Sequence, residues 1–204
     1  MITPNDVVAD PRYSHLKPEQ VTRELLSQYT REEQVRYDFD ALKRINSIKE
    51  EYGTGVSALV RIYNASGKTL TFETQGPNWH GHMFKYPPDY TILNGQWSVF
   101  LHVKTAGAAT GSESSVVYTV DDVNQDVFMG WGVPWNQSEW SSKVYTEVND
   151  RNHWPSVTSW DSMYTKINAS KKSSVSFFNG TNCSASIGDD TSPVVNYLAA
   201  FYTK

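Results

Sequence analysis

The sequence predicts a mostly β protein: a β-sandwich flanked by helices, with a charged helical segment at its N-terminal end. Apolar residues recur at helical spacing within residues 19–51, and from Val56 onward they alternate with a period of two. Short alternating runs separated by Gly, Pro, Asn and Ser are typical of a β-sandwich or barrel. We therefore expect a single domain over residues 1–204, in which a helical segment at 1–53 packs on a sandwich at 54–204.

The N-terminal segment is dense in Glu, Arg and Lys between residues 19 and 51 and is expected to form one or two amphipathic helices. Pro18 suits the first turn of a helix, and Gly53 suits its end. The apolar positions of the expected stripe are Val21, Leu25, Tyr29, Val35, Phe39, Leu42, Ile45 and Ile48. This stripe is narrow and the polar face carries both signs of charge, which suits a helix packed on a domain. A helix that inserts into a bilayer has a broader apolar face and fewer acids.

The alternating runs that follow are expected to be β-strands. They lie at residues 56–64, 68–74, 97–105, 114–120, 126–133, 143–148, 174–180 and 196–204. The turn residues 64–67 lie between the first two runs, so we expect these two strands to pair as a hairpin. Residues 156–168 interrupt the alternation and predict a helix beside the sheet, because their apolar positions fall at helical spacing. Those positions are Val157, Trp160, Met163, Tyr164 and Ile167.

The charge balance excludes a nucleic-acid partner. A net charge of −4, from 18 basic and 22 acidic residues, provides no field that would attract nucleic acid or anionic lipid. The first residues lack a cationic stretch followed by an apolar run, so no secretory signal peptide is expected. We therefore expect a cytoplasmic protein, which can act on outer membrane surfaces after non-classical release. Cys183, the only cysteine, excludes an intrachain disulfide; it lies in a predicted polar turn and is expected at or near the surface.

No catalytic motif is present, so neither an enzyme activity nor a cofactor is expected. Walker, G-x-S-x-G and H-E-x-x-H motifs are all missing from the sequence. The small residues at 104–112 predict a flexible loop between strands. The segment Trp79-His80-Gly81-His82 is the best metal candidate, because alternating histidines share one side of a strand. It lacks a clear third ligand, so we favour histidines that hydrogen-bond a loop or line a ligand site, with no metal.

A cluster of tryptophans indicates a binding surface. Trp131 is expected in the core of a strand, whereas Trp135 and Trp140 fall in a loop that contains Pro134, where burial is harder to arrange. Exposed loop tryptophans suit a bilayer interface or a carbohydrate, since both accept a flat apolar ring with a wet edge. Together with Trp160 and Tyr164 of the predicted helix, these side chains could form an aromatic cage for a quaternary ammonium such as choline.

Four stretches of the sequence are similar to known proteins. They read IYNASG (62–67), WHGH (79–82), NGQW (94–97) and FLHVKTAGAATG (100–111). Because of these stretches, residues 56–204 resemble the nakanori-type lipid-binding proteins of fungi and the small jasmonate-induced proteins of plants. The first fifty or so residues match less distinctively.

More distantly, the order of motifs is similar to that of the actinoporins, which are pore-forming β-sandwiches that recognise sphingomyelin. Residues 66–69, 109–111 and 132–134 fall in actinoporin order. By this resemblance Trp140 corresponds to the membrane loop, Trp160 and Tyr164 to the tyrosine-bearing helix, and the region from His80 to His82 to the headgroup serine. The loop after Pro134 is two residues shorter than in that family.

The two resemblances imply an actinoporin-like sandwich with a phosphocholine pocket between the Pro134–Trp140 loop and the helix. They also imply a peripheral membrane protein whose target is a complex of sphingomyelin with cholesterol. Because residues 19–51 are charged on several faces, we expect binding without pore formation. A pore-forming cytolysin, a lectin and a stress-related structural protein are the alternatives. The expected headgroup and membrane contacts are Trp79, His80, His82, Pro134, Trp135, Trp140, Trp160 and Tyr164.

Overall fold

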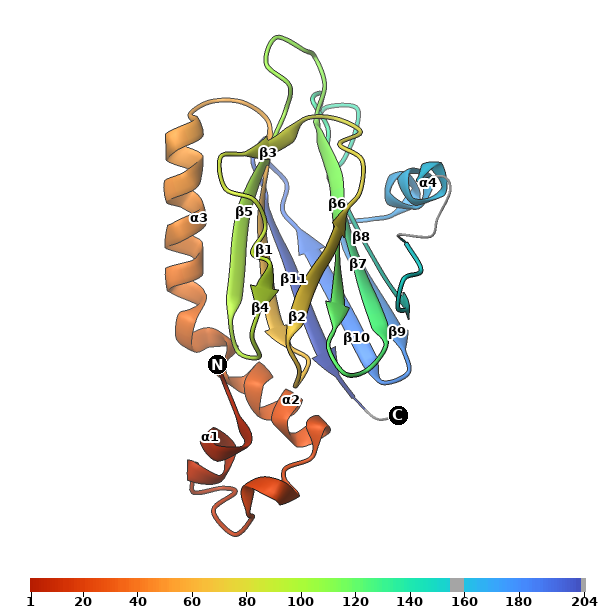
Figure 1. The fold of residues 1–204 in the computed structure, drawn as a ribbon. Helices are drawn as coiled ribbons and strands as arrows, with labels where there is room; N and C mark the ends of the chain where they lie inside the picture. Colours follow the sequence, from red (N-terminus) through yellow and green to blue (C-terminus); the bar gives the residue numbers. More distant parts are fainter. Residues whose placement is uncertain (155–159, 203–204) are drawn as a thin grey trace.

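The computed structural model describes residues 1–154 and 160–202 and contains two β-sheets packed face to face (Figure 1). In spatial order the six-stranded sheet consists of β3 (His82–Phe84), β5 (Trp97–Val103), β1 (Ser57–Ala65), β11 (Val194–Phe201), β10 (Thr181–Ile187) and β9 (Ser173–Phe178). The five-stranded sheet consists of β4 (Thr91–Ile92), β2 (Leu70–Gln75), β6 (Ser112–Val120), β7 (Gln125–Val133) and β8 (Lys143–Asp150). The predicted β-sandwich is confirmed.

The main core lies between the two sheets, where alternate residues of each strand point inward. Trp131 of β7 is fully buried there, as the sequence predicted, and its ring packs against Phe100 of β5 at 5.8 Å between centroids. Tyr197 of β11 crosses this core and donates a hydrogen bond of 2.7 Å to the carbonyl of Gly130. A buried tyrosine hydroxyl needs such a partner, and here the bond also joins the two sheets.

Helices cover the outer face of the six-stranded sheet. Figure 1 shows α3 (Asp38–Tyr52) lying along this face, and α2 (Arg23–Glu32) and α1 (Pro4–Ala9) near one end of the strands. Ile45 and Ile48 of α3 are buried against Leu59 of β1 and Leu101 of β5. Because β1 has the core on one face and these helices on the other, all nine of its residues are buried.

The apolar stripe predicted for the N-terminal segment is only partly correct. Ile45 and Ile48 are buried, but Val35 is 79% exposed and Phe39 is 73% exposed. A 3-10 stretch at Glu33–Tyr37 separates α2 from α3. Its tighter turn breaks the 3.6-residue period on which the predicted stripe depended. The helix α1 was not predicted.

The hairpin predicted for the first two strands is wrong. β1 pairs in parallel with β11 and antiparallel with β5, whereas β2 belongs to the other sheet and pairs with β6 and β4. The Asn64 side chain fixes the crossover between the sheets: its Nδ2 donates to the carbonyls of Lys68 (2.8 Å) and Ile92 (2.7 Å). Its Oδ1 accepts a hydrogen bond of 2.9 Å from the Ser66 amide. These bonds close the turn in a geometry that carries the chain to the opposite layer.

The strand β10 was missed because its sequence, TNCSASI, contains few large apolar residues. As a result the environment predicted for Cys183 is wrong. The thiol lies in the middle of β10 and is fully buried in the core, not in a polar turn. The short strands β3 and β4 were also not predicted.

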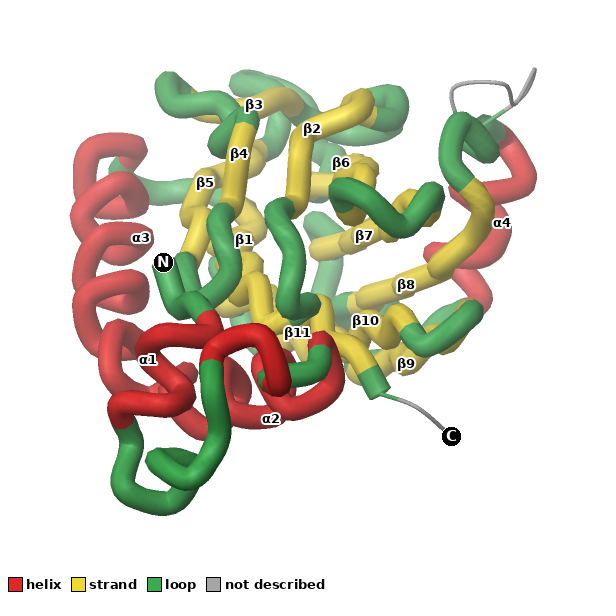
Figure 2. The backbone as a smooth tube through the Cα atoms, turned by 60° about the horizontal axis from the view of Figure 1, so that its bottom comes forward, coloured by secondary structure: helices red, strands yellow, loops and turns green. Residues whose placement is uncertain are grey.

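The helix predicted at 156–168 is found as α4 (Asp161–Ala169), and residues 155–159, with Val157, lie outside the described part of the chain. Met163 and Ile167 of α4 pack on the outer face of the five-stranded sheet against Phe128 and Trp154. Gly130 of β7 makes room for this contact, since a Cβ there would lie 2.7 Å from Ile167 Cδ1. Figure 2 shows α3 and α4 on opposite flanks of the sandwich.

Buried hydrogen bonds at Asn94 hold the N-terminal segment on the sandwich. The Asn94 Nδ2 donates to the Ile2 carbonyl (3.0 Å) and to Thr30 Oγ1 (2.8 Å), and its Oδ1 accepts from the Gly67 amide (3.0 Å). Asn94 is 5% exposed, so water cannot readily replace these partners.

We expect Asn94→Ala to lower the free energy of unfolding by about 2–3 kcal/mol, because it removes three hydrogen bonds that a nearly buried side chain makes to three separate segments. Urea denaturation measures this loss, and hydrogen exchange should show faster exchange in residues 2–32. The matched control is Asn5→Ala, at an exposed position of α1, which should change stability by less than about 0.5 kcal/mol. Equal effects of the two variants would contradict the role given to Asn94.

Candidate functional site

A cavity of about 410 Å³ lies between the loop at 134–141, the first residues of β6 and the helix α4. The loop that borders it, between β7 and β8, is at the end of the sandwich away from α1 and α2 (Figure 1). Its charged and aromatic lining residues are His80, Glu113, Trp135, Trp140, Lys143 and Tyr164. A second cavity, of about 590 Å³, lies beside the start of α3 and contains none of the residues predicted for the site. The first cavity is therefore the candidate site.

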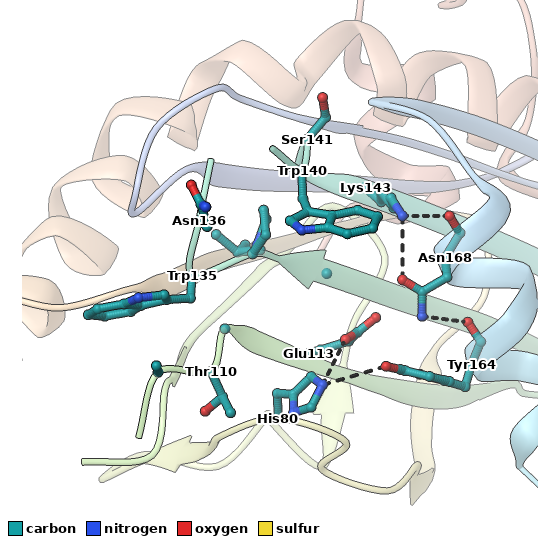
Figure 3. A pocket seen from close by; sticks show the side chains of 15 residues that line it. His80, Thr110, Glu113, Trp135, Asn136, Trp140, Ser141, Lys143, Tyr164 and Asn168 are labelled. Atoms are coloured by element: carbon teal, nitrogen blue, oxygen red, sulfur yellow. Dashed lines mark hydrogen bonds and ion pairs between the residues drawn. The ribbon is translucent and has the colours of Figure 1, made fainter. Parts of the chain in front are cut away.

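Two tryptophans stand at the rim of this cavity. Trp135 is 48% exposed and Trp140 is 60% exposed, so the predicted exposure of both side chains is confirmed. The loop is held by its own hydrogen bonds: the Trp140 amide donates to the Asn136 carbonyl (3.1 Å), and the Ser138 hydroxyl donates to Asn136 Oδ1 (2.7 Å). Figure 3 shows the Trp140 ring covering one side of the cavity while Trp135 extends away from it. These rings are thus positioned by a turn and not by burial.

Glu113 of β6 forms the floor of the cavity. The residue is 8% exposed, and its Oε2 lies 3.8 Å from His80 Nε2, which in turn lies 3.5 Å from the Tyr164 hydroxyl. Burial raises the pKa of Glu113 to about 7, although Lys143 and Asn168 favour the charged form and partly offset this effect. Perturbed carboxyl groups in a cavity are typical of functional sites.

Lys143 of β8 places a positive charge in the same cavity. Its Nζ donates to the backbone carbonyl of Asn168 (2.6 Å) and, at 3.4 Å, to Asn168 Oδ1. Asn168 Nδ2 donates in turn to the Tyr164 carbonyl (3.2 Å), so these bonds join β8 to α4 (Figure 3). The cavity therefore presents an ammonium and a carboxyl group between aromatic side chains.

Five of the eight residues predicted for the site line this cavity: His80, Pro134, Trp135, Trp140 and Tyr164. Two others lie behind it and support it. Trp79 packs on the Tyr164 ring at 5.4 Å between centroids, and Trp160 stacks on Phe128 at 6.5 Å. These two tryptophans help to seat α4 on the sheet.

His82 does not reach the cavity, and the prediction that it shares a strand face with His80 is wrong. Gly81 has a φ of +100°, which breaks the alternation between the two histidines. A Cβ at Gly81 would lie 2.1 Å from the Val103 carbonyl oxygen, so only glycine fits there. His82 begins β3, pairs with Val103 and is exposed.

Sequence reasoning missed Glu113, Lys143 and Asn168. Glu113 precedes the predicted strand at 114–120, and nothing in its neighbours shows that it faces a cavity. Its position opposite Gly132 becomes visible only in the register of β6 and β7. Lys143 and Asn168 meet only because α4 packs beside β8.

Within the described residues, no group of three or more His, Cys, Asp and Glu side chains is arranged to hold a metal ion. His102 is fully buried between Ser112 Oγ (2.8 Å) and Asn78 Oδ1 (3.1 Å). Burial lowers its pKa to about 3, so the imidazole is neutral at physiological pH. Over residues 1–154 and 160–202, the helices are all too short or too polar to cross a membrane.

Comparisons with known proteins agree with this architecture. A family model described as Nakanori-like protein matches residues 3–201. The chain belongs to the Nakanori-like family. The crystal structure of lipid binding protein Nakanori has a TM-score of 0.90 and 34% sequence identity, over 98% of this chain and 96% of that chain. The 23 kDa jasmonate-induced protein of Hordeum vulgare is 38% identical over 159 residues, which is 76% of this chain and 74% of that protein. The resemblances to the nakanori-type proteins and to the jasmonate-induced proteins, expected from the sequence motifs, are thus confirmed.

The buried carboxyl group of Glu113 should make the protein less stable above neutral pH. Its pKa is about 7 in the folded state against 4.5 ordinarily, so the destabilisation grows as the pH rises from about 4.5 through 7. We expect Glu113→Gln to raise the free energy of unfolding at pH 8 by on the order of 1–2 kcal/mol and to have little effect near pH 5.

Chemical denaturation at the two pH values measures this difference. Glu139→Gln, which removes the same charge from an exposed position in the neighbouring loop, is the control and should be nearly neutral at both. A loss of stability in Glu113→Gln at pH 8 would mean that Lys143 and Asn168 stabilise the carboxylate by more than its burial costs.

Proposed function

We propose that this chain is a peripheral membrane protein that binds the phosphocholine headgroup of sphingomyelin, in complexes with cholesterol, without forming a pore. The main observation in favour of the proposal is the cavity, which contains the opposite charges of Glu113 and Lys143 and has exposed tryptophans at its rim. Membership of the Nakanori-like family and the similarity to the crystal structure of the lipid binding protein Nakanori support it.

The chemistry of the cavity suits a zwitterion. The Lys143 ammonium can meet the phosphate, and the Trp140 and Tyr164 rings can meet the quaternary ammonium through cation–π attraction. Opposite charges within one cavity favour a ligand that has no net charge. The low net charge of the whole chain, −4, agrees with a neutral lipid surface in preference to an anionic one.

The rim suits the interface of a bilayer. Trp135 and Trp140 present apolar rings with a polar indole nitrogen, the combination that favours the headgroup region. The Lys104 ammonium lies 4.5 Å from the centre of the Trp135 ring, so the exposed ring has a cation–π contact on one face. Cholesterol dependence rests on the family resemblance, and no side chain is assigned to it.

The N-terminal segment supports binding without a pore. The actinoporins that the sequence distantly resembles line their pore with an N-terminal amphipathic helix, and such a helix would have to leave the sandwich. Here Ile45 and Ile48 of α3 are buried, and Asn94 holds both Ile2 and Thr30. Releasing the segment would expose the outer face of β1 and β5 to water.

The test is cosedimentation with dye-loaded vesicles of three compositions: phosphatidylcholine with cholesterol, sphingomyelin alone, and sphingomyelin with cholesterol. We expect binding to the third set only, with the dye retained. Dye release at stoichiometric protein would identify a pore-forming cytolysin. If no vesicle set binds the protein, the lipid proposal fails, and a glycan screen would test the lectin alternative.

We expect Trp140→Ala to weaken vesicle binding by about tenfold, equivalent to ~1.4 kcal/mol, because it removes an aromatic contact at the rim. The melting temperature should change by less than about 2 °C, since the side chain is largely exposed. Phe39→Ala, an exposed aromatic residue on α3 outside the cavity lining, is the control and should leave binding unchanged. A large fall in melting temperature would show that Trp140 contributes to the core.

A further inference from the structure

We infer that Glu113 selects the cationic part of the ligand, so that the cavity binds a quaternary ammonium group and releases it when the carboxylate takes up a proton. The inference rests on the proposed function and adds to it a specificity-determining residue and a pH dependence.

The geometry leaves the Glu113 carboxylate open to a ligand. Glu113 of β6 lies directly opposite Gly132 of β7 in the register of the two strands. A Cβ at residue 132 would lie 3.1 Å from Glu113 Oε1, so the glycine keeps the space above the carboxylate free of a side chain. Figure 3 shows the carboxylate between the Trp140 ring on one side and His80 with Tyr164 on the other.

The groups that face this carboxylate come from three other elements. His80 lies in the segment between β2 and β3, Lys143 is on β8, and Tyr164 and Asn168 are on α4. The His80 contact, at 3.8 Å between Nε2 and Oε2, is longer than a hydrogen bond. Lys143 is already directed at the Asn168 carbonyl at 2.6 Å. The buried carboxylate therefore has room for a further cationic partner.

A quaternary ammonium is the cation that fits best. It has no N–H donor, so it gains nothing from a hydrogen-bond acceptor and is bound by a nearby negative charge and by aromatic faces. Glu113 provides the charge and Trp140 and Tyr164 provide the faces. A primary ammonium carries a stronger hydration shell, whose loss in this cavity would be compensated less fully.

Protons should compete with such a ligand. Burial raises the pKa of Glu113 to about 7, so the carboxylate loses much of its charge between pH 8 and pH 6. A bound cation favours the ionised form, and therefore affinity should fall by about tenfold over this range.

The experiment titrates the full chain with two kinds of probe at pH 6, 7 and 8, following tryptophan fluorescence. The first probe is tetramethylammonium chloride, with sodium chloride at equal ionic strength as the reference. The second is vesicles of sphingomyelin with cholesterol. For the wild-type chain we expect both affinities to fall by about tenfold from pH 8 to pH 6. Methylammonium chloride should bind more weakly than tetramethylammonium at pH 8.

The deciding variant is Glu113→Gln, with Glu50→Gln, at an exposed position of α3 outside the cavity lining, as the matched control. At pH 8, Glu113→Gln should lose about tenfold in affinity for both probes, and its remaining binding should vary little with pH. Thermal denaturation at each pH confirms that the variant is folded. Wild-type affinity and an unchanged pH profile in Glu113→Gln would overturn the inference.

The two probes separate failure of the inference from failure of the proposed function. Vesicle binding that is insensitive to Glu113→Gln would leave the lipid function intact and refute the role of Glu113. The opposite result is that no vesicles bind, while tetramethylammonium binding depends on pH and is lost in Glu113→Gln. That result would support the cation site and refute the membrane function.

Discussion

The parallel pairing of β1 with β11 is the constraint on which the rest of the fold depends. It places the first and last strands side by side in the middle of the six-stranded sheet, in register from Leu59 opposite Val194 to Ala65 opposite Ala200. β1 is buried on both faces: Val60 and Ile62 point into the sandwich, whereas Leu59 points toward α3. A strand that is apolar on both faces needs a layer on each side. The N-terminal helices are therefore a structural layer of the sandwich.

The candidate site contains a buried carboxyl group, which lowers the stability of the fold and is held in place by the two sheets. The sandwich buries the Glu113 carboxyl group next to a strand position that has no side chain, and that burial raises the pKa of Glu113. A neutral or apolar residue would suit the fold better at this position. Residues that lower stability in a cavity are commonly retained for binding or catalysis. The energetic cost of burying Glu113 thus agrees with the proposed recognition of a cation.

The tryptophans of this chain have three different roles, although the residue type is the same. Trp131 fills the core between the sheets, and Trp160 packs on Phe128 beneath α4. Trp135 and Trp140 are exposed at the rim of the cavity. The proposed membrane contact thus depends on a rigid support, because the buried rings hold the strands and the helix from which the exposed loop extends. Aromatic rings in such a loop can contact a bilayer without a change in the fold.

The sequence by itself determined the mostly β fold, the position of most strands, the burial of Trp131 and the exposure of Trp135 and Trp140. Each follows from a local pattern: period-two alternation, or tryptophans flanking a proline turn. Only the tertiary structure decided which strands pair, since a turn such as residues 64–67 can close a hairpin or cross between sheets. It also decided that His80 lines the cavity while His82 does not, and that Glu113 faces Gly132. These outcomes depend on register and on contacts between distant segments, which local spacing does not encode.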